Sequence, residues 1–105
     1  MVRLPTHRAP VHPGEVLLED FLIPLGISQV ALAELLGIPF QRVNQIVKGR
    51  RSVTPDTALR LARLFGTTPE VWLNLQLAYD LYAAQRSPEA KTIAKIRPLR
   101  HSTAA

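Results

Sequence analysis

The sequence predicts an all-α protein with five helices, and three observations carry this prediction. Proline stands where the helical patterns begin and glycine where they end, which is the usual asymmetry of helix starts and stops. Strand-like alternation of apolar and polar residues is nearly absent from the 105 residues. Because 47% of the residues are apolar and 20% are charged, the composition favours one folded domain with one core.

The first two helices are marked by their flanking residues. The first is expected to begin near Pro13, with Glu15 in its first turn, and to stop by Pro24. Ser28 is expected to cap the second helix, because its hydroxyl can accept a hydrogen bond from a free N–H of the first turn. Gly37 can adopt the left-handed conformation that ends this helix. Its buried stripe should consist of Leu32, Ala33, Leu35 and Leu36.

The third helix has two chemically different faces. It is expected to start at Pro39 and to close at Gly49. At helical spacing, one face is apolar and carries Val43, Ile46 and Val47. The other face is largely polar and carries Gln41, Arg42, Asn44, Gln45 and Lys48.

The fourth and fifth helices begin with the same local signal. A threonine cap, a proline at the first helical position and an acid in the first turn occur at both Thr54-Pro55-Asp56 and Thr68-Pro69-Glu70. The fourth helix should end at Gly66 and the fifth at about Gln85. The fourth should bury Ala58, Leu61, Ala62 and Phe65.

The fifth helix is too apolar to bury only one face, which implies a second packing partner. One interpretation packs its faces against the first helix and the C-terminal tail. The other, which we favour, is a homodimer interface, where Trp and Tyr are common anchors. The residues predicted for this interface are Trp72, Leu75, Tyr79 and Tyr82.

The chain divides into an N-terminal arm (1–11), one domain (12–85) and a basic tail (86–105). The tail has three apolar residues spaced by three, Ile93, Ile96 and Leu99. We expect this tail to be only partly ordered. Alternatively, residues 92–99 form a short strand or helical turn against a partner.

The segment from Ser28 to Arg51 has the sequence form of a helix-turn-helix, which reads DNA by placing its second helix in the major groove. Ala33 suits the close contact of the two helices, and Gly37 suits the turn. The free N–H groups at the start of the first of these helices can dock on phosphate. A solvated helix surface is the plain alternative for the polar face, but no acid interrupts residues 40–53.

The DNA contacts divide by side-chain chemistry. Amides pair bidentately with adenine and arginine with guanine, while an aromatic ring can contact a thymine methyl. The residues predicted to reach bases are Phe40, Gln41, Arg42, Asn44 and Gln45. Cations and polar groups around them are expected to bind the DNA backbone. The predicted phosphate-binding residues are Ser28, Gln29, Lys48, Arg50 and Arg51.

Composition narrows the other function classes. The net charge of +5 favours an anionic partner, either a nucleic acid or a membrane surface. No apolar run approaches the roughly 18 residues needed to span a bilayer, so the cytoplasm is the expected compartment. The absence of cysteine excludes disulfides and thiolate metal sites. No catalysis, metal or cofactor is predicted, and the three histidines are expected to be surface residues: His7, His12 and His101.

Two further motifs make the pattern more specific. The sequence HPGE opens the first helix at residues 12–15, and TPEVWLNLQ opens the fifth at residues 68–76. Together with the helix-turn-helix, they resemble the HigA-type, VapI-like antitoxins of addiction modules within the Xre and phage-repressor family. The resemblance covers about residues 12–85 and implies a lambda-repressor-like fold.

The resemblance implies a homodimer that binds an inverted repeat in double-stranded DNA at its own promoter. It also implies a cognate toxin, a RelE-like or HigB-like ribonuclease that cleaves messenger RNA, which the antitoxin neutralises by direct binding. The protein itself would catalyse nothing. The alternative is a stand-alone Xre-type repressor without a toxin partner, while a small enzyme or membrane-surface protein is the least favoured hypothesis.

Overall fold

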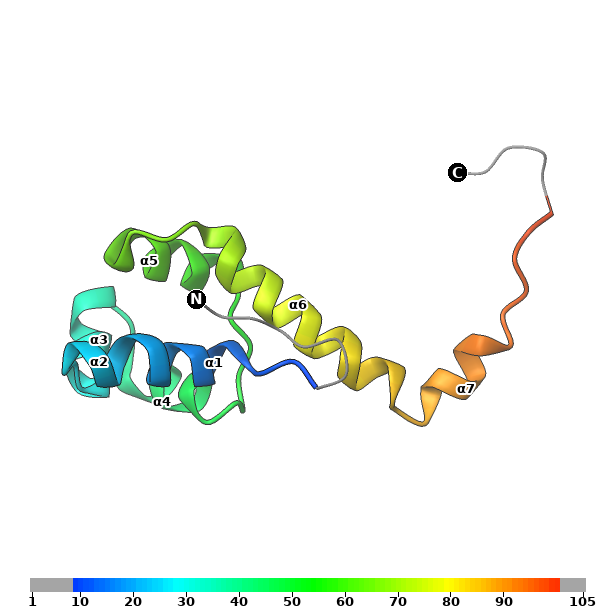
Figure 1. Ribbon diagram of the computed structural model, residues 1–105, viewed down its shortest axis with the longest axis horizontal. Coiled ribbons are helices and arrows are strands. Elements are labelled where there is room, and N and C mark those ends of the chain that lie inside the picture. The colour runs from blue at the N-terminus through cyan, green and yellow to red at the C-terminus, as the bar shows by residue number, and fades with distance from the viewer. Residues whose placement is uncertain (1–8, 101–105) are drawn as a thin grey trace.

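The computed structural model describes residues 9–100, and all regular structure within this range is helical (Figure 1). The predicted all-α class is confirmed. The elements are α1 (Pro13–Val16), η1 (Leu17–Leu22), α2 (Ile23–Leu25), α3 (Gln29–Leu36), α4 (Phe40–Val47), α5 (Pro55–Phe65), α6 (Pro69–Gln85) and α7 (Glu89–Ala94). The elements α1, η1 and α2 form one continuous run, which corresponds to the first predicted helix. The helices α3, α4, α5 and α6 correspond to the second, third, fourth and fifth.

The first helical run contains a π-helical segment, η1, which ends two residues before Pro24. A proline inside a helix lacks an N–H donor and crowds the carbonyl four residues before it. The wider π-helical turns precede this position and carry the helix past the predicted stop at Pro24, to Leu25. The run ends at Gly26, whose φ of +66° is left-handed.

Three helices begin with the predicted side-chain caps. Ser28 Oγ accepts a hydrogen bond from the Ala31 N–H at 3.0 Å. The Thr54 and Thr68 hydroxyls accept from the N–H groups three residues later in the same way. Each cap satisfies a backbone donor that has no partner within its own helix, so these local signals determine where the helices start. Pro39 is itself the cap residue of α4, which begins one residue later than predicted.

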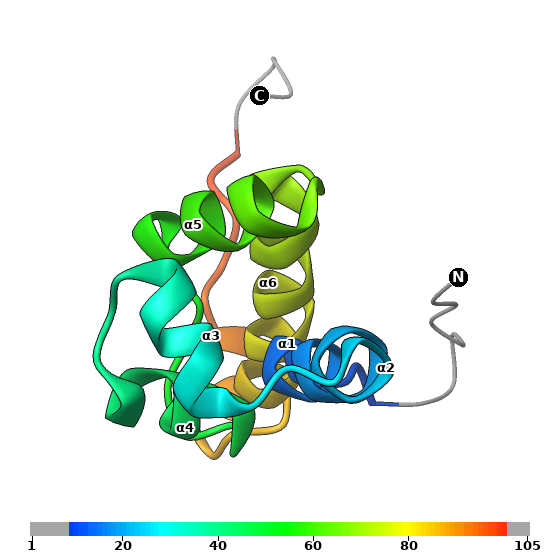
Figure 2. The same ribbon diagram turned by 90° about the vertical axis from the view of Figure 1, so that its left-hand side faces the viewer.

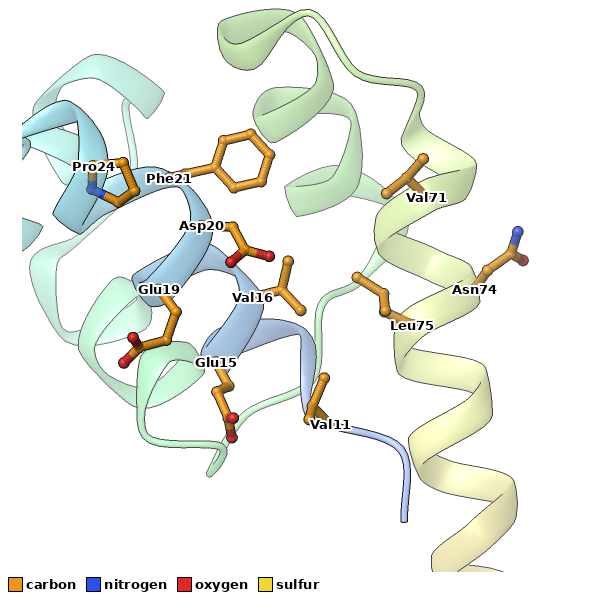
Figure 3. Close-up of a pocket in the computed structure, with 10 residues that line it drawn as sticks. All are labelled: Val11, Glu15, Val16, Glu19, Asp20, Phe21, Pro24, Val71, Asn74 and Leu75. Carbon is orange, nitrogen blue, oxygen red and sulfur yellow. The ribbon is translucent and has the colours of Figure 1, made fainter. Parts of the chain in front are cut away.

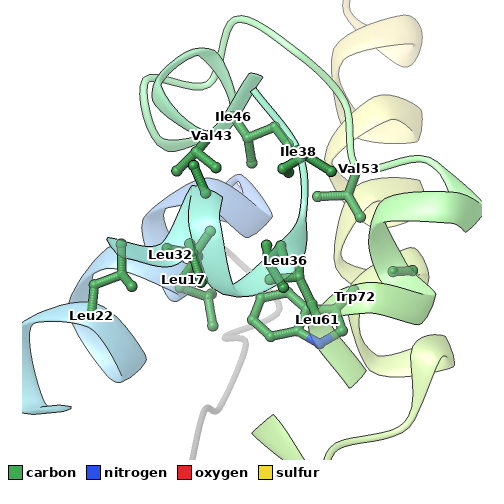
Figure 4. Packing of buried hydrophobic residues seen from close by; sticks show 13 residues of the cluster. Leu17, Leu22, Leu32, Leu36, Ile38, Val43, Ile46, Val53, Leu61 and Trp72 are labelled. Carbon is green, nitrogen blue, oxygen red and sulfur yellow. The ribbon is translucent and has the colours of Figure 1, made fainter. Parts of the chain in front are cut away.

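The core lies where the helices converge on Trp72, which has no exposed surface (Figure 4). The Trp72 indole N–H donates to Thr67 Oγ1 at 2.8 Å, and the Phe21 ring packs 5.3 Å from it. The buried apolar cluster consists of Val16, Leu17, Leu22, Leu32, Ala33, Leu36, Ile38, Val43, Ile46, Val53, Ala58, Leu61 and Trp72. Two predicted core positions differ, since Leu35 is 59% exposed and Phe65 is only partly buried.

The helix α6 projects beyond the globular body (Figure 1). Its first half packs on α5, and Leu77 and Leu81 farther along are more than half exposed. Beyond it, α7 occupies part of the tail for which the sequence left two interpretations open, and every residue from Lys91 to Arg100 is exposed. The described chain is therefore elongated, with extents of 54 × 27 × 27 Å.

Within residues 9–100, no single helix has both the length and the apolar character to cross a bilayer, although the bent pair Pro13–Leu25 and Gln29–Leu36 passes on length and composition together.

Candidate nucleic-acid interface

Helices α3 and α4 form a compact unit joined by a tight turn. Gly37 has a φ of +69°, and the Ile38 N–H donates back to the Ala33 carbonyl at 3.1 Å. Val43 and Ile46 are almost completely buried, which fixes the rotation of α4 about its axis. The predicted helix-turn-helix is therefore present (Figure 2), and Gln41 and Gln45 of α4 are exposed.

The outward face of α4 carries amides one helical turn apart. Gln41 and Gln45 are exposed, and Phe40 beside them is 44% exposed. Side chains four residues apart on a helix project from the same face. This face therefore presents two amides and one aromatic ring that can contact base edges in a major groove.

Gln29, at the start of α3, contacts Asn44 in the second half of α4. The Asn44 Nδ2 donates to Gln29 Oε1 at 3.0 Å, and both residues are half-buried. The Gln29 Oε1 accepts this bond, so the two N–H donors of Gln29 Nε2 are not used by it. Asn44 acts in this structure as a positioning partner of a predicted phosphate-binding residue.

The cations that follow α4 surround its C-terminal end. Arg51 Nε donates to Gln45 Oε1 at 2.8 Å, which orients the Gln45 amide. The Arg50 N–H donates to the Gln45 carbonyl at 2.8 Å, so the chain turns back under the helix. Lys48, Arg50 and Arg51 are all exposed. Three cations next to two exposed amides suit a surface that binds the DNA backbone and reads bases side by side.

Arg42 does not lie where the sequence predicted. Its Nη2 donates to Asp56 Oδ2 at 2.7 Å and to the Thr57 hydroxyl, and its side chain is 24% exposed. The guanidinium therefore faces the N-terminal turn of α5 rather than the outward face of α4. Base reading by Arg42 stays a prediction, and it would require the side chain to leave Asp56.

Asp56 joins three helices through two arginines. It accepts from Arg42 and, at 2.9 Å, from Arg60 Nε, and these hydrogen bonds, Arg42 first, hold the pKa of the Asp56 carboxyl below its usual value. Arg60 Nη1 also donates to the Leu36 carbonyl at the end of α3. Sequence reasoning missed this network. The i,i+4 spacing of Asp56 and Arg60 was a usable signal, whereas Arg42 lies 14 residues from Asp56 and gave none.

His12 is buried, so the expectation of a surface histidine is wrong for this residue. Its Nδ1 accepts from the Gly14 N–H at 2.9 Å and caps α1, and its ring meets the Tyr79 ring edge-on at 4.9 Å. Burial lowers the pKa of His12, and the charge of Asp80 acts in the opposite direction. His7 and His101 lie outside the described residues.

Gln76 connects the loop after the helix-turn-helix to α6. It is 6% exposed, its Oε1 accepts from the Val53 N–H at 2.8 Å, and its Nε2 donates to Asp80 at 3.0 Å. A buried backbone N–H needs such a partner. Its place on α6 gave no sign in the sequence that it would reach a residue 23 positions away.

The predicted dimer residues do not share one environment. Trp72 has no exposed surface, so it anchors the core of the protomer and is removed from the predicted interface. Leu75, Tyr79 and Tyr82 are partly exposed along α6. The Arg86 guanidinium lies 3.5 Å from the centre of the Tyr82 ring, a cation–π contact at the end of the helix.

Comparison with known proteins yields one consistent set of relatives. A helix-turn-helix family model matches residues 18–72. Virulence-associated protein I of Dichelobacter nodosus is 47% identical over 83 residues, which are 79% of this chain and 77% of that protein.

Solved structures with the same fold are similar along most of the chain. An addiction module antidote protein of the HigA family from Coxiella burnetii has a TM-score of 0.80 and 48% identity, covering 88% of this chain and 100% of its own. The Pseudomonas aeruginosa antitoxin HigA, solved with the higBA promoter, has a TM-score of 0.80 and 41% identity, covering 87% and 99%.

Proposed function

This chain belongs to the helix-turn-helix family and, within it, to the HigA antitoxins and VapI-like proteins, and from this we propose that it is the antitoxin of a toxin–antitoxin module. The family is a class of DNA-binding regulators and not of enzymes. In our proposal the protein binds an inverted repeat in its own promoter as a homodimer, represses its operon and neutralises the toxin by direct binding.

The observation that carries the proposal is the outward face of α4, where exposed amides are bordered by exposed cations. We assign base contacts to Phe40, Gln41 and Gln45. Asn44 holds Gln29, and the phosphate contacts are assigned to Ser28, Gln29, Lys48, Arg50 and Arg51. A relative of 41% identity, Pseudomonas aeruginosa HigA, was solved with a promoter, which supports the same use of this surface.

Operator binding is tested with the full chain and DNA from upstream of its reading frame. Gln45→Ala should weaken binding to the preferred sequence by about 1–3 kcal/mol and change binding to unrelated DNA little. Gln85→Ala removes an equivalent exposed amide at the far end of α6 and should have no effect. If both variants bind like the unaltered protein, the assignment of the α4 face is wrong.

The toxin partner is proposed as a RelE-like or HigB-like ribonuclease that cleaves messenger RNA. The support is that relatives of 41% to 48% identity are HigA antitoxins or antidote proteins. Co-expression with the adjacent reading frame should give a stable complex and restore growth that the neighbour alone arrests. A repressor that binds its operator but captures no neighbouring product would instead be the stand-alone Xre-type regulator.

A further inference from the structure

An open groove of about 930 Å³ separates the first helical run from the start of α6 (Figure 3). Val16 and Phe21 line it from α1 and η1, and Val71 and Leu75 face them from α6. Val71 is 45% exposed and Leu75 is partly exposed. An apolar floor that water still reaches gains stability when another apolar segment covers it.

The rim of this groove is acidic although the protein is basic. Glu15, Glu19 and Asp20 line it and are all exposed. Among residues 9–100, the ion pairs involve none of these three carboxylates, since both pairs are made by Asp56. The chemistry of the groove therefore suits a segment that is apolar on one side and cationic on the other.

The C-terminal tail of this chain has that chemistry. Three large aliphatic side chains of the tail are strongly exposed to solvent: Ile93 at 57%, Ile96 at 70% and Leu99 at 86%. Lys91, Lys95, Arg97 and Arg100 alternate with them along the same segment. This tail projects away from the body of its own protomer (Figure 1), so its apolar side chains are left without cover there.

A two-fold axis would bring one tail to the groove of another chain. A symmetric dimer uses the same patch on both copies, and a two-fold axis crossing α6 places the two helices antiparallel. If this axis passes midway between Leu75 and Tyr82, the limits of the partly exposed interface residues, Val71 of one chain lies opposite Arg86 of the other. The tail then leaves its own helix directly beside the acidic groove of the partner.

We propose that the groove between η1 and α6 binds the basic, apolar tail of a second copy of this chain, so that each dimer holds two exchanged tails. This rests on the homodimer of the proposed function. The tail covers the apolar floor, and its lysines and arginines meet Glu15, Glu19 and Asp20.

The absence of cysteine allows a clean cross-linking test in the full chain. One sample carries Val71→Cys and another carries Ile93→Cys, and the two are mixed and treated with a short bis-maleimide. We expect a product that joins the two different chains. In the control, Leu59→Cys replaces Val71→Cys in the mixture with Ile93→Cys. Leu59 lies on α5 and is 60% exposed, and this mixture should give severalfold less product.

Three results would overturn the proposal. The first is equal cross-linking of the Leu59→Cys control. The second is a double variant, Val71→Cys with Ile93→Cys, that yields only an internally linked single chain, which means that the tail folds onto its own groove. The third is a dimer by sedimentation velocity that shows no link between Val71→Cys and Ile93→Cys; in that case the dimer stands and the exchanged tail does not.

Charge reversal checks the electrostatic part independently of the engineered cysteines. Glu19→Lys with Asp20→Lys, or Lys91→Glu with Lys95→Glu, should weaken the dimer severalfold in 0.1 M salt and less in 1 M salt, where the Debye length falls from about 10 Å to about 3 Å. All four substitutions together should restore association. Equal behaviour of the four-fold variant and the two pairs of substitutions would contradict recognition by charge.

Discussion

Gly14 lets α1 lie directly against the backbone of α4. A Cβ at this position would come within 1.7 Å of the Ile46 carbonyl oxygen, and a backbone atom at the end of a packed helix cannot move aside cheaply. The sequence placed Gly14 in the HPGE motif at the start of a helix. It gave no reason for the glycine, because the contact is made 32 residues further along the chain.

Gly14→Ala should therefore destabilise the protein by about 3 kcal/mol, at the upper end of overpacking effects, because α1 must shift away from α4. Denaturant unfolding measures the change. The neighbouring exposed residue provides the control, since Glu15→Ala should stay within about 0.5 kcal/mol. Equal stability of the two variants would mean that α1 does not lie against Ile46 in solution.

His12 makes the stability of the fold depend on pH. Its Nδ1 must be unprotonated to accept from the Gly14 N–H, and burial holds its pKa below the ordinary value of about 6.5. The unfolded chain consequently binds more protons between the two pKa values. The contribution of His12 to stability is complete above about pH 6.5 and is lost as pH falls through the folded pKa.

Thermal unfolding between neutral and mildly acidic pH should show this loss. The variant His12→Asn retains a side chain that caps helices but does not titrate, so its melting temperature should change less over the same range. A melting curve for His12→Asn with the same pH dependence as the unaltered chain would assign the effect to another group.

At the scale of the helical elements, Asp56, Arg42 and Arg60 hold α3, α4 and α5 in one arrangement. Arg42→Ala should lower the melting temperature while leaving the preference between operator and unrelated DNA unchanged. Gln45→Ala should have the reverse pattern, because its amide lies on the outward face. A loss of sequence preference in Arg42→Ala that matches Gln45→Ala would place Arg42 among the base-reading residues.

The helices themselves could be predicted because their ends are local. The cap side chains of Ser28, Thr54 and Thr68 each accept from a backbone N–H three residues later, so they can be predicted without knowledge of the fold. The burial of His12 depends on packing between distant segments, since its ring meets Tyr79 of α6. The sequence predicts Trp72 as a dimer-interface residue and this is wrong, because sequence periodicity cannot distinguish a core that belongs to one chain from an interface between two.

At the scale of the whole molecule, the proposed dimer sets the spacing of its operator. Two α4 helices related by a two-fold axis should contact half-sites about 34–36 Å apart, or a multiple of that distance. Hydroxyl-radical footprinting measures the spacing directly. Protection of a single, asymmetric half-site would exclude the symmetric dimer as the DNA-bound form.

The cations beside α4 predict how binding depends on salt. Lys48→Ala should weaken binding to all DNA sequences about equally and reduce the slope of log affinity against log salt by about one per contact. Arg63→Ala removes an exposed cation from α5 and serves as the matched control, with no change in slope. Equal slopes for the two variants would remove Lys48 from the phosphate contacts.

Gln76 has a consequence for how genetic data on this protein are interpreted. Its buried amide supports the Val53 N–H beside the helix-turn-helix and also contacts Asp80 on α6. A random screen for failed repression would recover Gln76 substitutions alongside those of Gln45, although Gln76 lies in the interior and touches no DNA. A map of such mutants, drawn without the structure, would extend the apparent DNA-binding surface into the middle of the protein.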